Sequence, residues 1–260
     1  MPAVGFGVYQ IAPEATERAV GDALEVGYRM IDTAASYFNE EQVGNAIRSS
    51  GLKREELFVT TKLWVQDYEY DDALRAFDRS MKALGLDSLD LFLLHKPYGN
   101  YYAAWRAVEK LYEEGRIRAI GVTSFSDERL QDLFLHNEVK PAVNQIETNP
   151  FYQQAASNAF LAKEGIQHEA WAPFAEIFNN PVLKTIAGKH GKTVAAVILR
   201  WLNQRGIVVI PKSVRKERMA ENLNIFDFTL TGQEMRAIAG LDTGKSPIYD
   251  DMDLATTRFI

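Results

Sequence analysis

The feature of the sequence that most limits its fold is an alternation between apolar runs and helical patterns. Eight runs are rich in Val, Ile, Leu or Phe, and most lack strict polar alternation, as strands buried on both faces do. They cover residues 3–9, 28–33, 57–62, 89–95, 117–123, 142–146, 166–171 and 206–211. Eight such strands with helices between them predict an α/β protein, a (β/α)8 barrel in a single domain over residues 1–260.

Helical periodicity fills the gaps between these runs. Leu74, Phe77, Met81 and Leu84 are spaced by 3, 4 and 3 residues, which places them on one face of a helix. Thr193 precedes another apolar helical pattern and is a suitable N-cap. These patterns separate the strands as a barrel requires.

A doubly wound sheet is the rival architecture, and it favours a glycine-rich phosphate-binding turn after an early strand. The stretch "GFGVYQ" at residues 5–10 has two glycines in GxG spacing. No third glycine follows and no helix opens directly after it, so the fingerprint is incomplete. The sequence therefore favours the barrel.

Composition excludes several classes of protein. The net charge is −6 with acidic and basic residues interspersed, which argues against a nucleic-acid partner. The absence of cysteine excludes disulfides, thiolate metal sites and a cysteine nucleophile, and we expect no metal site. There is no basic region followed by an apolar run at the start, and the apolar run 194–199 is too short to span a bilayer. We expect a cytoplasmic protein without a membrane partner.

Polar side chains gather where the expected strands end, which is where barrel proteins place their active sites. These ends carry Tyr9, Asp32 with Tyr37 just beyond, Lys62, His95, Thr123, Ser124, Asn144, Gln145, Trp171, Lys212 and Ser213. Each has an ordinary structural explanation: Asp32 as a cap, Lys62 in solvent, or His95 in the core. Four polar groups at the same end of successive strands are hard to explain by packing, so the set predicts an active site.

Several long stretches resemble the aldo-keto reductase family, nearly from end to end. They include "GYRMIDTAASYFNEEQVG", "LDLFLLHKP", "PAVNQIETNPF" and "VVIPKSVRKERMAENL". The resemblance implies the barrel fold, a monomer, and NAD(P)H-dependent reduction of small aldehydes and ketones. The likeness is strongest to microbial members that reduce small dicarbonyls and diketogluconate-type sugar acids.

The resemblance also implies a catalytic tetrad of Asp32, Tyr37, Lys62 and His95. Reducing a carbonyl places negative charge on its oxygen, so a proton donor is needed, and Tyr37 is the candidate acid. A phenol has a pKa of about 10, and an ammonium about 4 Å away favours the tyrosinate by on the order of 4 kcal/mol at an effective dielectric near 20. Lys62 would supply that charge, Asp32 would hold Lys62, and a neutral His95 would orient the substrate oxygen.

The cofactor residues follow from the same resemblance. Asn144 and Gln145 match the "NQ" pair whose glutamine meets the nicotinamide carboxamide, and Trp171 matches the aromatic that stacks on the ring. Lys212, Ser213 and Arg218 match residues that bind the adenosine 2′-phosphate, which favours NADPH over NADH. Other expected cofactor contacts are Thr123 and Ser124 beside the carboxamide, Phe174 on the phosphate loop, and Glu221 and Asn222 on the adenine.

Aromatic residues are expected to wall the substrate pocket. Tyr9, Phe38 and Trp64 would join His95 there, although each is also a plausible rim side chain. Lys96 follows His95 and either attracts a substrate carboxylate or lies in solvent.

Four departures from the family pattern stand out. Ser124 replaces an asparagine, Ala172 a serine and Lys96 a tryptophan, and most of the usual N-terminal β-hairpin is missing; its loss would expose apolar side chains at the barrel bottom. These changes leave a second hypothesis open, a cofactor-binding regulatory barrel with low turnover. A third hypothesis is an aldolase that forms a Schiff base on Lys62.

Overall fold

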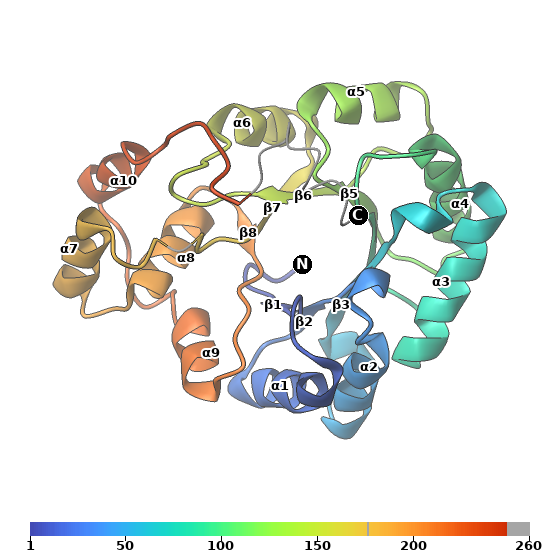
Figure 1. Cartoon of the computed structure of the whole chain (residues 1–260), viewed down its shortest axis with the longest axis horizontal. Helices are drawn as coiled ribbons and strands as arrows, with labels where there is room; N and C mark the ends of the chain where they lie inside the picture. The colour runs from blue at the N-terminus through green and yellow to red at the C-terminus, as the bar shows by residue number, and fades with distance from the viewer. Residues whose placement is uncertain (176, 249–260) are drawn as a thin grey trace.

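The fold is a ring of parallel strands enclosed by helices (Figure 1). The computed structural model of the chain describes residues 1–175 and 177–248. Its eight strands lie in chain order in one sheet. They are β1 (Phe6–Gly7), β2 (Met30–Asp32), β3 (Phe58–Leu63), β4 (Leu91–Leu94), β5 (Ile120–Thr123), β6 (Val143–Glu147), β7 (Gln167–Trp171) and β8 (Val208–Val209). All eight lie within the expected apolar runs except the last residue of β3 and of β6.

Contacts between the first and last strands close the ring. Val4 pairs in parallel with Val209, and the Gly5 N–H donates to the Val209 carbonyl at 2.8 Å. The ladders at β1 and β8 are short, so the expected run 3–9 is reduced to Phe6–Gly7. The chain nevertheless forms the expected (β/α)8 barrel.

The helices form the outer layer and follow the strands. They are α1 (Pro13–Val26), α2 (Glu40–Ser49), α3 (Tyr70–Leu84), α4 (Tyr101–Glu113), α5 (Asp127–Leu135), α6 (Ala155–Glu164), α7 (Pro181–His190), α8 (Val194–Gln204), α9 (Lys216–Leu223) and α10 (Gly232–Ala239). Thr193 caps α8 as expected, because its hydroxyl accepts a hydrogen bond from the Ala196 N–H at 3.1 Å. No helix within residues 1–175 and 177–248 is long and apolar enough to cross a bilayer.

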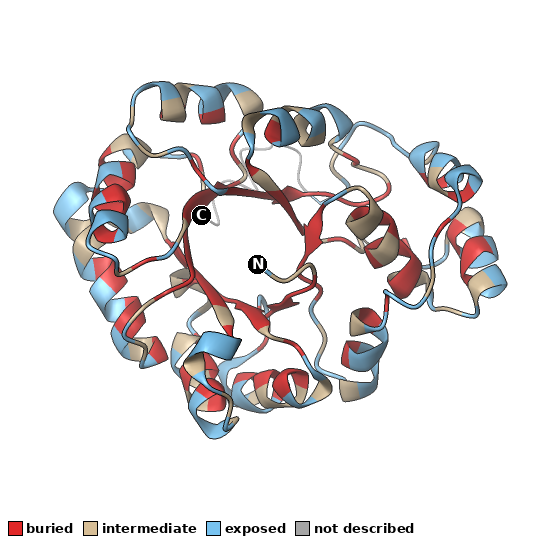
Figure 2. Ribbon diagram, turned by 180° about the vertical axis from the view of Figure 1, so that it is seen from behind, coloured by how far each residue is buried: buried red, intermediate tan, exposed pale blue. Residues whose placement is uncertain are grey.

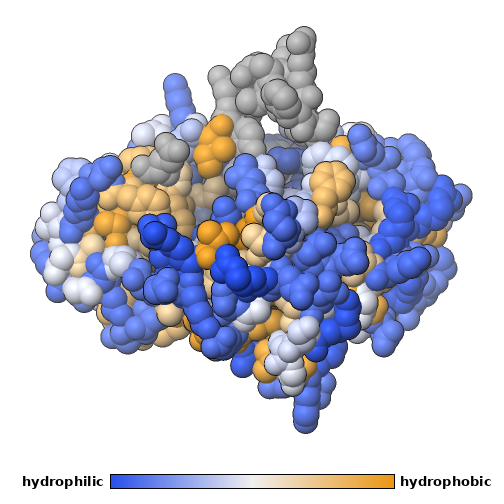
Figure 3. Space-filling view, turned by 60° about the horizontal axis from the view of Figure 1, so that its bottom comes forward, coloured by the Kyte–Doolittle hydropathy of each residue, from blue (hydrophilic) through white to orange (hydrophobic). Residues whose placement is uncertain are grey.

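Each helix turns one face inward. Figure 2 shows buried residues along the strands and on the inner sides of the helices, with exposed residues outside. In α3, Phe77, Met81 and Leu84 are buried and Leu74 is half-buried, as their spacing predicts. The face drawn in Figure 3 is mostly hydrophilic, with hydrophobic residues in separate spots.

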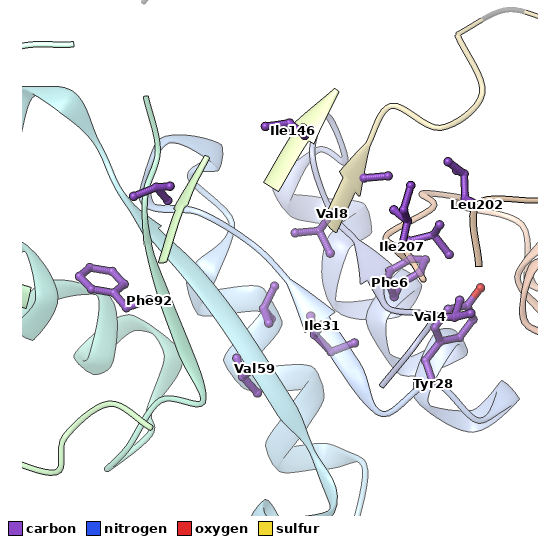
Figure 4. Close-up of a cluster of buried hydrophobic side chains, with 14 of the residues drawn as sticks. Val4, Phe6, Val8, Tyr28, Ile31, Val59, Phe92, Ile146, Leu202 and Ile207 are labelled. Atoms are coloured by element: carbon purple, nitrogen blue, oxygen red, sulfur yellow. The ribbon is translucent and has the colours of Figure 1, made fainter. Parts of the chain in front are cut away.

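Side chains alternate between the two sides of the barrel wall. Ile31 and Val59 point outward into the large core between sheet and helices, part of which Figure 4 shows. Their neighbours face the barrel interior, where Met30 packs with Val208 and Ile210. On β2 the next residue that faces the interior after Met30 is Asp32. The interior is therefore apolar at the end where the strands begin and polar at the end where they finish.

The chain begins at the barrel opening. The N-terminus lies inside the ring of strands in the views of Figures 1 and 2, and residues 1–5 form no hairpin. We expected apolar exposure at the barrel bottom; among the apolar residues at the strand starts there, Met30 and Val208 are buried and Phe58 is half-buried. That expectation is wrong for Met30 and Val208, because they pack against Ile210 inside the barrel.

Gly44 lets α2 approach α3 closely, which predicts a specific stability loss. A Cβ at this position would lie 2.2 Å from the Leu84 carbonyl oxygen, so the backbone would have to move. Gly44→Ala should therefore lower the free energy of unfolding by about 1–3 kcal/mol and the Tm by several degrees, measured by calorimetry. Gly21→Ala in α1 is the matched control, because nothing lies within 4 Å of its added Cβ. Equal Tm values for the two variants would contradict this account.

Candidate active site

A buried ion pair occupies the carboxyl end of the barrel. The Lys62 Nζ lies 2.6 Å from Asp32 Oδ1, and the two side chains are 0% and 3% exposed. The same ammonium donates to the Thr33 carbonyl at 2.9 Å and to the Tyr37 hydroxyl at 3.3 Å. All three N–H donors of Lys62 therefore have partners, as a buried ammonium requires.

The environment of Lys62 keeps it charged. Burial lowers its pKa, but Asp32 and Tyr37 raise it, and the pKa ends above its ordinary value of 10.5. The site therefore contains a permanent positive charge beside the Tyr37 hydroxyl.

Tyr37 behaves differently from the sequence-based expectation. Burial raises its pKa and outweighs the lowering by Lys62, so the pKa reaches about 12. Lys62 does lower the pKa of Tyr37, as expected from the sequence, but burial penalises the tyrosinate anion more strongly, so the pKa rises overall. Tyr37 is consequently a neutral hydrogen-bond donor.

Asn39 anchors the loop that carries Tyr37. Tyr37 ends a single 3-10 turn, η1 (Ala35–Tyr37), and Asn39 follows it fully buried. The Asn39 amide donates to the Val8 carbonyl at 3.2 Å and accepts from the Thr33 hydroxyl at 3.0 Å. These bonds tie the loop after β2 to the loop after β1, which limits the positions available to the phenol.

His95 follows β4 and lies beside Tyr37. Their ring centroids are 5.5 Å apart, and His95 Nδ1 lies 3.2 Å from the Ser36 hydroxyl. Burial, then the charges of Lys62 and Lys96, hold the pKa of His95 well below 6.5. The imidazole is neutral, in agreement with the expectation from the sequence.

Aromatic side chains flank this pair on two sides. The Tyr9 ring lies 5.0 Å from Tyr37, and the Trp64 ring lies 5.1 Å from His95. Phe38 is 83% exposed with a φ of +56°, an uncommon conformation for a bulky residue. Tyr9 and Trp64 are thus beside the tetrad, whereas Phe38 extends into solvent; their role in a substrate pocket stays a prediction.

Lys96 directly follows His95, and its side chain reaches Trp171. Its backbone is held by the buried Tyr68 hydroxyl, which donates to the Lys96 carbonyl at 2.9 Å and accepts from its N–H at 3.1 Å. The Lys96 ammonium lies 5.8 Å from the centre of a Trp171 ring. This arrangement places a positive charge at the wall of the site.

Gln145 joins the ion pair to a further carboxyl group. Its amide nitrogen donates to Asp32 Oδ2 at 3.0 Å and to Glu169 Oε1 at 2.9 Å. Glu169 faces Gln145 across β6 and β7 and is fully buried. Sequence reasoning missed Glu169, although an acidic residue two positions before Trp171 in a strand was a usable signal.

Asn144, in contrast, is directed away from this cluster. It neighbours Gln145 on β6, so its side chain emerges on the opposite side of the sheet. Its amide nitrogen donates to the Phe125 carbonyl at 2.9 Å and the side chain is fully buried. The expected cofactor contact through the Asn144 side chain is therefore wrong.

The two residues after Val122 lie beside the tetrad. The Thr123 hydroxyl donates to the His95 carbonyl. Ser124 has a φ of +59°, and its N–H donates to the Gln145 carbonyl at 2.9 Å. That backbone region is one that asparagine tolerates well, which accounts physically for the asparagine usual in the family.

The expected adenosine-binding residues belong to one segment, the loop after β8 and helix α9. Lys212, Arg218 and Glu221 are exposed, Ser213 is half-buried, and Asn222 is buried at 5%. The Ser213 hydroxyl accepts from the Arg215 N–H at 3.1 Å, which shapes the turn before α9. Phe174 lies on another loop, with its ring 5.5 Å from that of Phe178. Binding by these residues stays a prediction.

The described residues contain no cluster of three or more His, Asp or Glu side chains placed to hold a metal ion.

Comparison with known proteins identifies the family. The model of the aldo/keto reductase family matches residues 3–179 and 176–243. The chain is 48% identical to the glyoxal reductase of Bacillus subtilis, over 93% of this chain and 89% of the relative. It is 44% identical to a methylglyoxal reductase of Escherichia coli, over 94% of this chain and 91% of the relative.

A solved structure shows the same fold. The aldo-keto reductase of Bombyx mori in complex with NADP superimposes with a TM-score of 0.92 at 35% identity. That match covers 96% of this chain and 92% of the other. The chain therefore belongs to the aldo/keto reductase family, and the barrel fold and the reductase class predicted from its sequence are confirmed.

Proposed function

We propose that this aldo-keto reductase uses NADPH to reduce small aldehydes, ketones or dicarbonyls, including keto-sugar acids, to alcohols. The observation that carries the proposal is the contact of the Lys62 ammonium with both Asp32 and the Tyr37 hydroxyl. The glyoxal and methylglyoxal reductase relatives support the substrate class. We further propose a monomer that acts in the cytoplasm on a small molecule.

Tyr37 acts as the general acid. When bound, NADPH supplies the hydride to the carbonyl carbon. The Tyr37 hydroxyl donates its proton to the carbonyl oxygen as negative charge develops there. A pKa of about 12 suits this step, because an alkoxide is a much stronger base than a phenolate and takes the proton readily. The Lys62 charge then stabilises the tyrosinate that remains.

His95 orients the substrate oxygen. The neutral imidazole can donate one hydrogen bond, and the Ser36 hydroxyl can donate to Nδ1. With the Ser36 hydroxyl as the donor, the imidazole carries its proton on Nε2, which would donate to the carbonyl oxygen alongside the Tyr37 hydroxyl. Two donors on one oxygen fix the carbonyl for attack.

The residues that would hold NADPH fit its chemistry. Trp171 offers a half-exposed aromatic face to the nicotinamide, and Gln145, Thr123 and Ser124 would surround its carboxamide. The exposed Lys212 and Arg218, with Ser213, would bind the 2′-phosphate, since two cations and a hydroxyl suit a dianion. Phe174, Glu221 and Asn222 would contact the rest of the nucleotide.

The aldolase hypothesis fits the site less well, and an experiment separates the regulatory barrel from the reductase. An aldolase needs a neutral lysine amine, but Lys62 is held in its charged form. A regulatory barrel would bind NADPH with little turnover, and the Ser124 and Ala172 replacements leave that route open. Steady-state turnover of a small aldehyde with NADPH separates these cases, because binding without turnover on any carbonyl would favour the regulator.

Removing the Tyr37 hydroxyl should stop the reaction. Tyr37→Phe should lower kcat by about 10²–10⁴-fold, the usual contribution of a general acid, with the NADPH Kd changed less than about twofold. Tyr112→Phe, which removes an exposed phenol on α4, is the control and should behave as the parent protein. Unchanged turnover in Tyr37→Phe would exclude Tyr37 as the acid.

Arg218 should distinguish the two nicotinamide cofactors. Arg218→Ala should raise the Kd of NADPH by roughly 10–100-fold, the loss expected for a charge-assisted contact, and that of NADH by less than about threefold. Arg215→Ala removes an exposed charge three residues away and should have a smaller effect. If both cofactors weakened equally, the 2′-phosphate contact would lie elsewhere.

A further inference from the structure

The proposed mechanism gives no task to Glu169, the fully buried carboxyl group inside the barrel. Its Oε1 accepts a hydrogen bond from the Gln145 amide at 2.9 Å. Its Oε2 is buried and has no hydrogen-bond partner among the described residues. A buried carboxyl group with an unpaired oxygen lowers the free energy of unfolding. Its presence therefore points to a functional role for Glu169.

The charges around Glu169 favour its neutral form. The charged groups that act on it are Asp32 from β2 and Lys62 from β3, and Gln145 from β6 is its hydrogen-bond donor. Burial and then Asp32 raise the pKa of Glu169 to about 8, while Lys62 and the Gln145 bond oppose the rise. The positive charge of Lys62 is therefore balanced by the carboxylate of Asp32. Within the part of the chain that the structure describes, Glu169 has no cation of its own and keeps its proton at neutral pH.

Glu169 and Asp32 together fix the orientation of the Gln145 side-chain amide. The amide nitrogen lies between the two carboxyl groups and donates to both. Rotating the amide by 180° would place its oxygen against Asp32 Oδ2, a carboxylate oxygen that can only accept, and would remove the hydrogen bond that the amide nitrogen donates to Glu169 Oε1. The amide oxygen is consequently left as an acceptor that is not used within the cluster.

We propose that Glu169 is a positioning residue for the cofactor: it holds Gln145 so that the amide oxygen accepts from the carboxamide NH2 of the nicotinamide. This inference rests on the proposed NADPH-dependent function. It also explains why a buried acid lies beside an ion pair that is already balanced. Because Glu169 acts through Gln145, its effect is confined to the nicotinamide half of the cofactor.

The test compares two ligands and two variants. The ligands are NADPH and adenosine 2′,5′-bisphosphate, which keeps the 2′-phosphate but lacks the nicotinamide. Glu169→Leu removes the acceptor and should raise the Kd of NADPH by about tenfold, while the Kd of the bisphosphate changes less than about twofold. Glu169→Gln keeps a neutral acceptor of the same shape and should recover most of the NADPH affinity. Equal weakening of both ligands, or no change in the Leu variant, would overturn the proposal.

The Tm of Glu169→Gln and of the parent protein, measured over a range of pH, tests whether Glu169 is neutral in the folded protein. An unfolded glutamate ionises near its ordinary pKa of 4.5, whereas the folded protein keeps the proton to about 8. Stability is therefore lost as the pH rises through this window, and the Gln variant escapes that loss. The Tm of the variant relative to the parent should rise by several degrees between about pH 5 and about pH 8.5. A constant difference would show that Glu169 is not held neutral, against the proposal.

These measurements are independent of turnover. If the parent protein bound NADPH but reduced no aldehyde, the proposed reduction would fail while the two-ligand comparison could still be made. If reduction were observed and Glu169→Leu bound NADPH as the parent does, only the role of Glu169 would fail.

Discussion

The site depends on one buried ion pair, Asp32 with Lys62. Removing two charges from water costs several kcal/mol per ion, and only close geometry with complete hydrogen bonding offsets that cost. Lys62 meets the condition with Asp32, the Thr33 carbonyl and the Tyr37 hydroxyl as its three partners. The barrel makes this possible because neighbouring parallel strands deliver both side chains to the same end of its interior.

The ion pair also determines how Tyr37 can work. The nearby ammonium favours the tyrosinate, but burial in the same site disfavours it more strongly, so the phenol rests in its neutral form. Lys62 therefore matters most once the proton has left and the anion needs a partner. The neutral His95 complements this arrangement, since a second cation at that position would repel Lys62.

Much of the site could be predicted from the sequence because barrel strands bring their ends together. Asp32, Lys62 and His95 follow from their places at the ends of apolar runs, and Tyr37 from the short loop after β2. The hydrogen bond from Gln145 to Asp32 could not be predicted, because it joins residues 113 positions apart in the chain. Glu169 was overlooked although its place two residues before Trp171 in a strand was a usable signal.

Other errors have local causes. Asn144 was assigned to the cofactor site together with Gln145 from the resemblance to the family's "NQ" pair, although neighbouring residues on a strand point to opposite sides. The pKa of Tyr37 was judged from a single charge, without the burial that only the closed barrel reveals. Hydrogen bonds between distant strands of the barrel, and the burial of each side chain, could therefore be known only from the structure.

The central claim is that Asp32 keeps Lys62 charged beside Tyr37, and the pH dependence of kcat in Asp32→Asn tests it most directly. Without the carboxylate, burial should lower the pKa of Lys62 by one unit or more, since desolvation alone shifts buried lysines by up to about 3–5 units. We predict that the alkaline fall in kcat moves to lower pH in the variant by at least about one unit. Identical pH profiles for the variant and the parent protein would contradict the account.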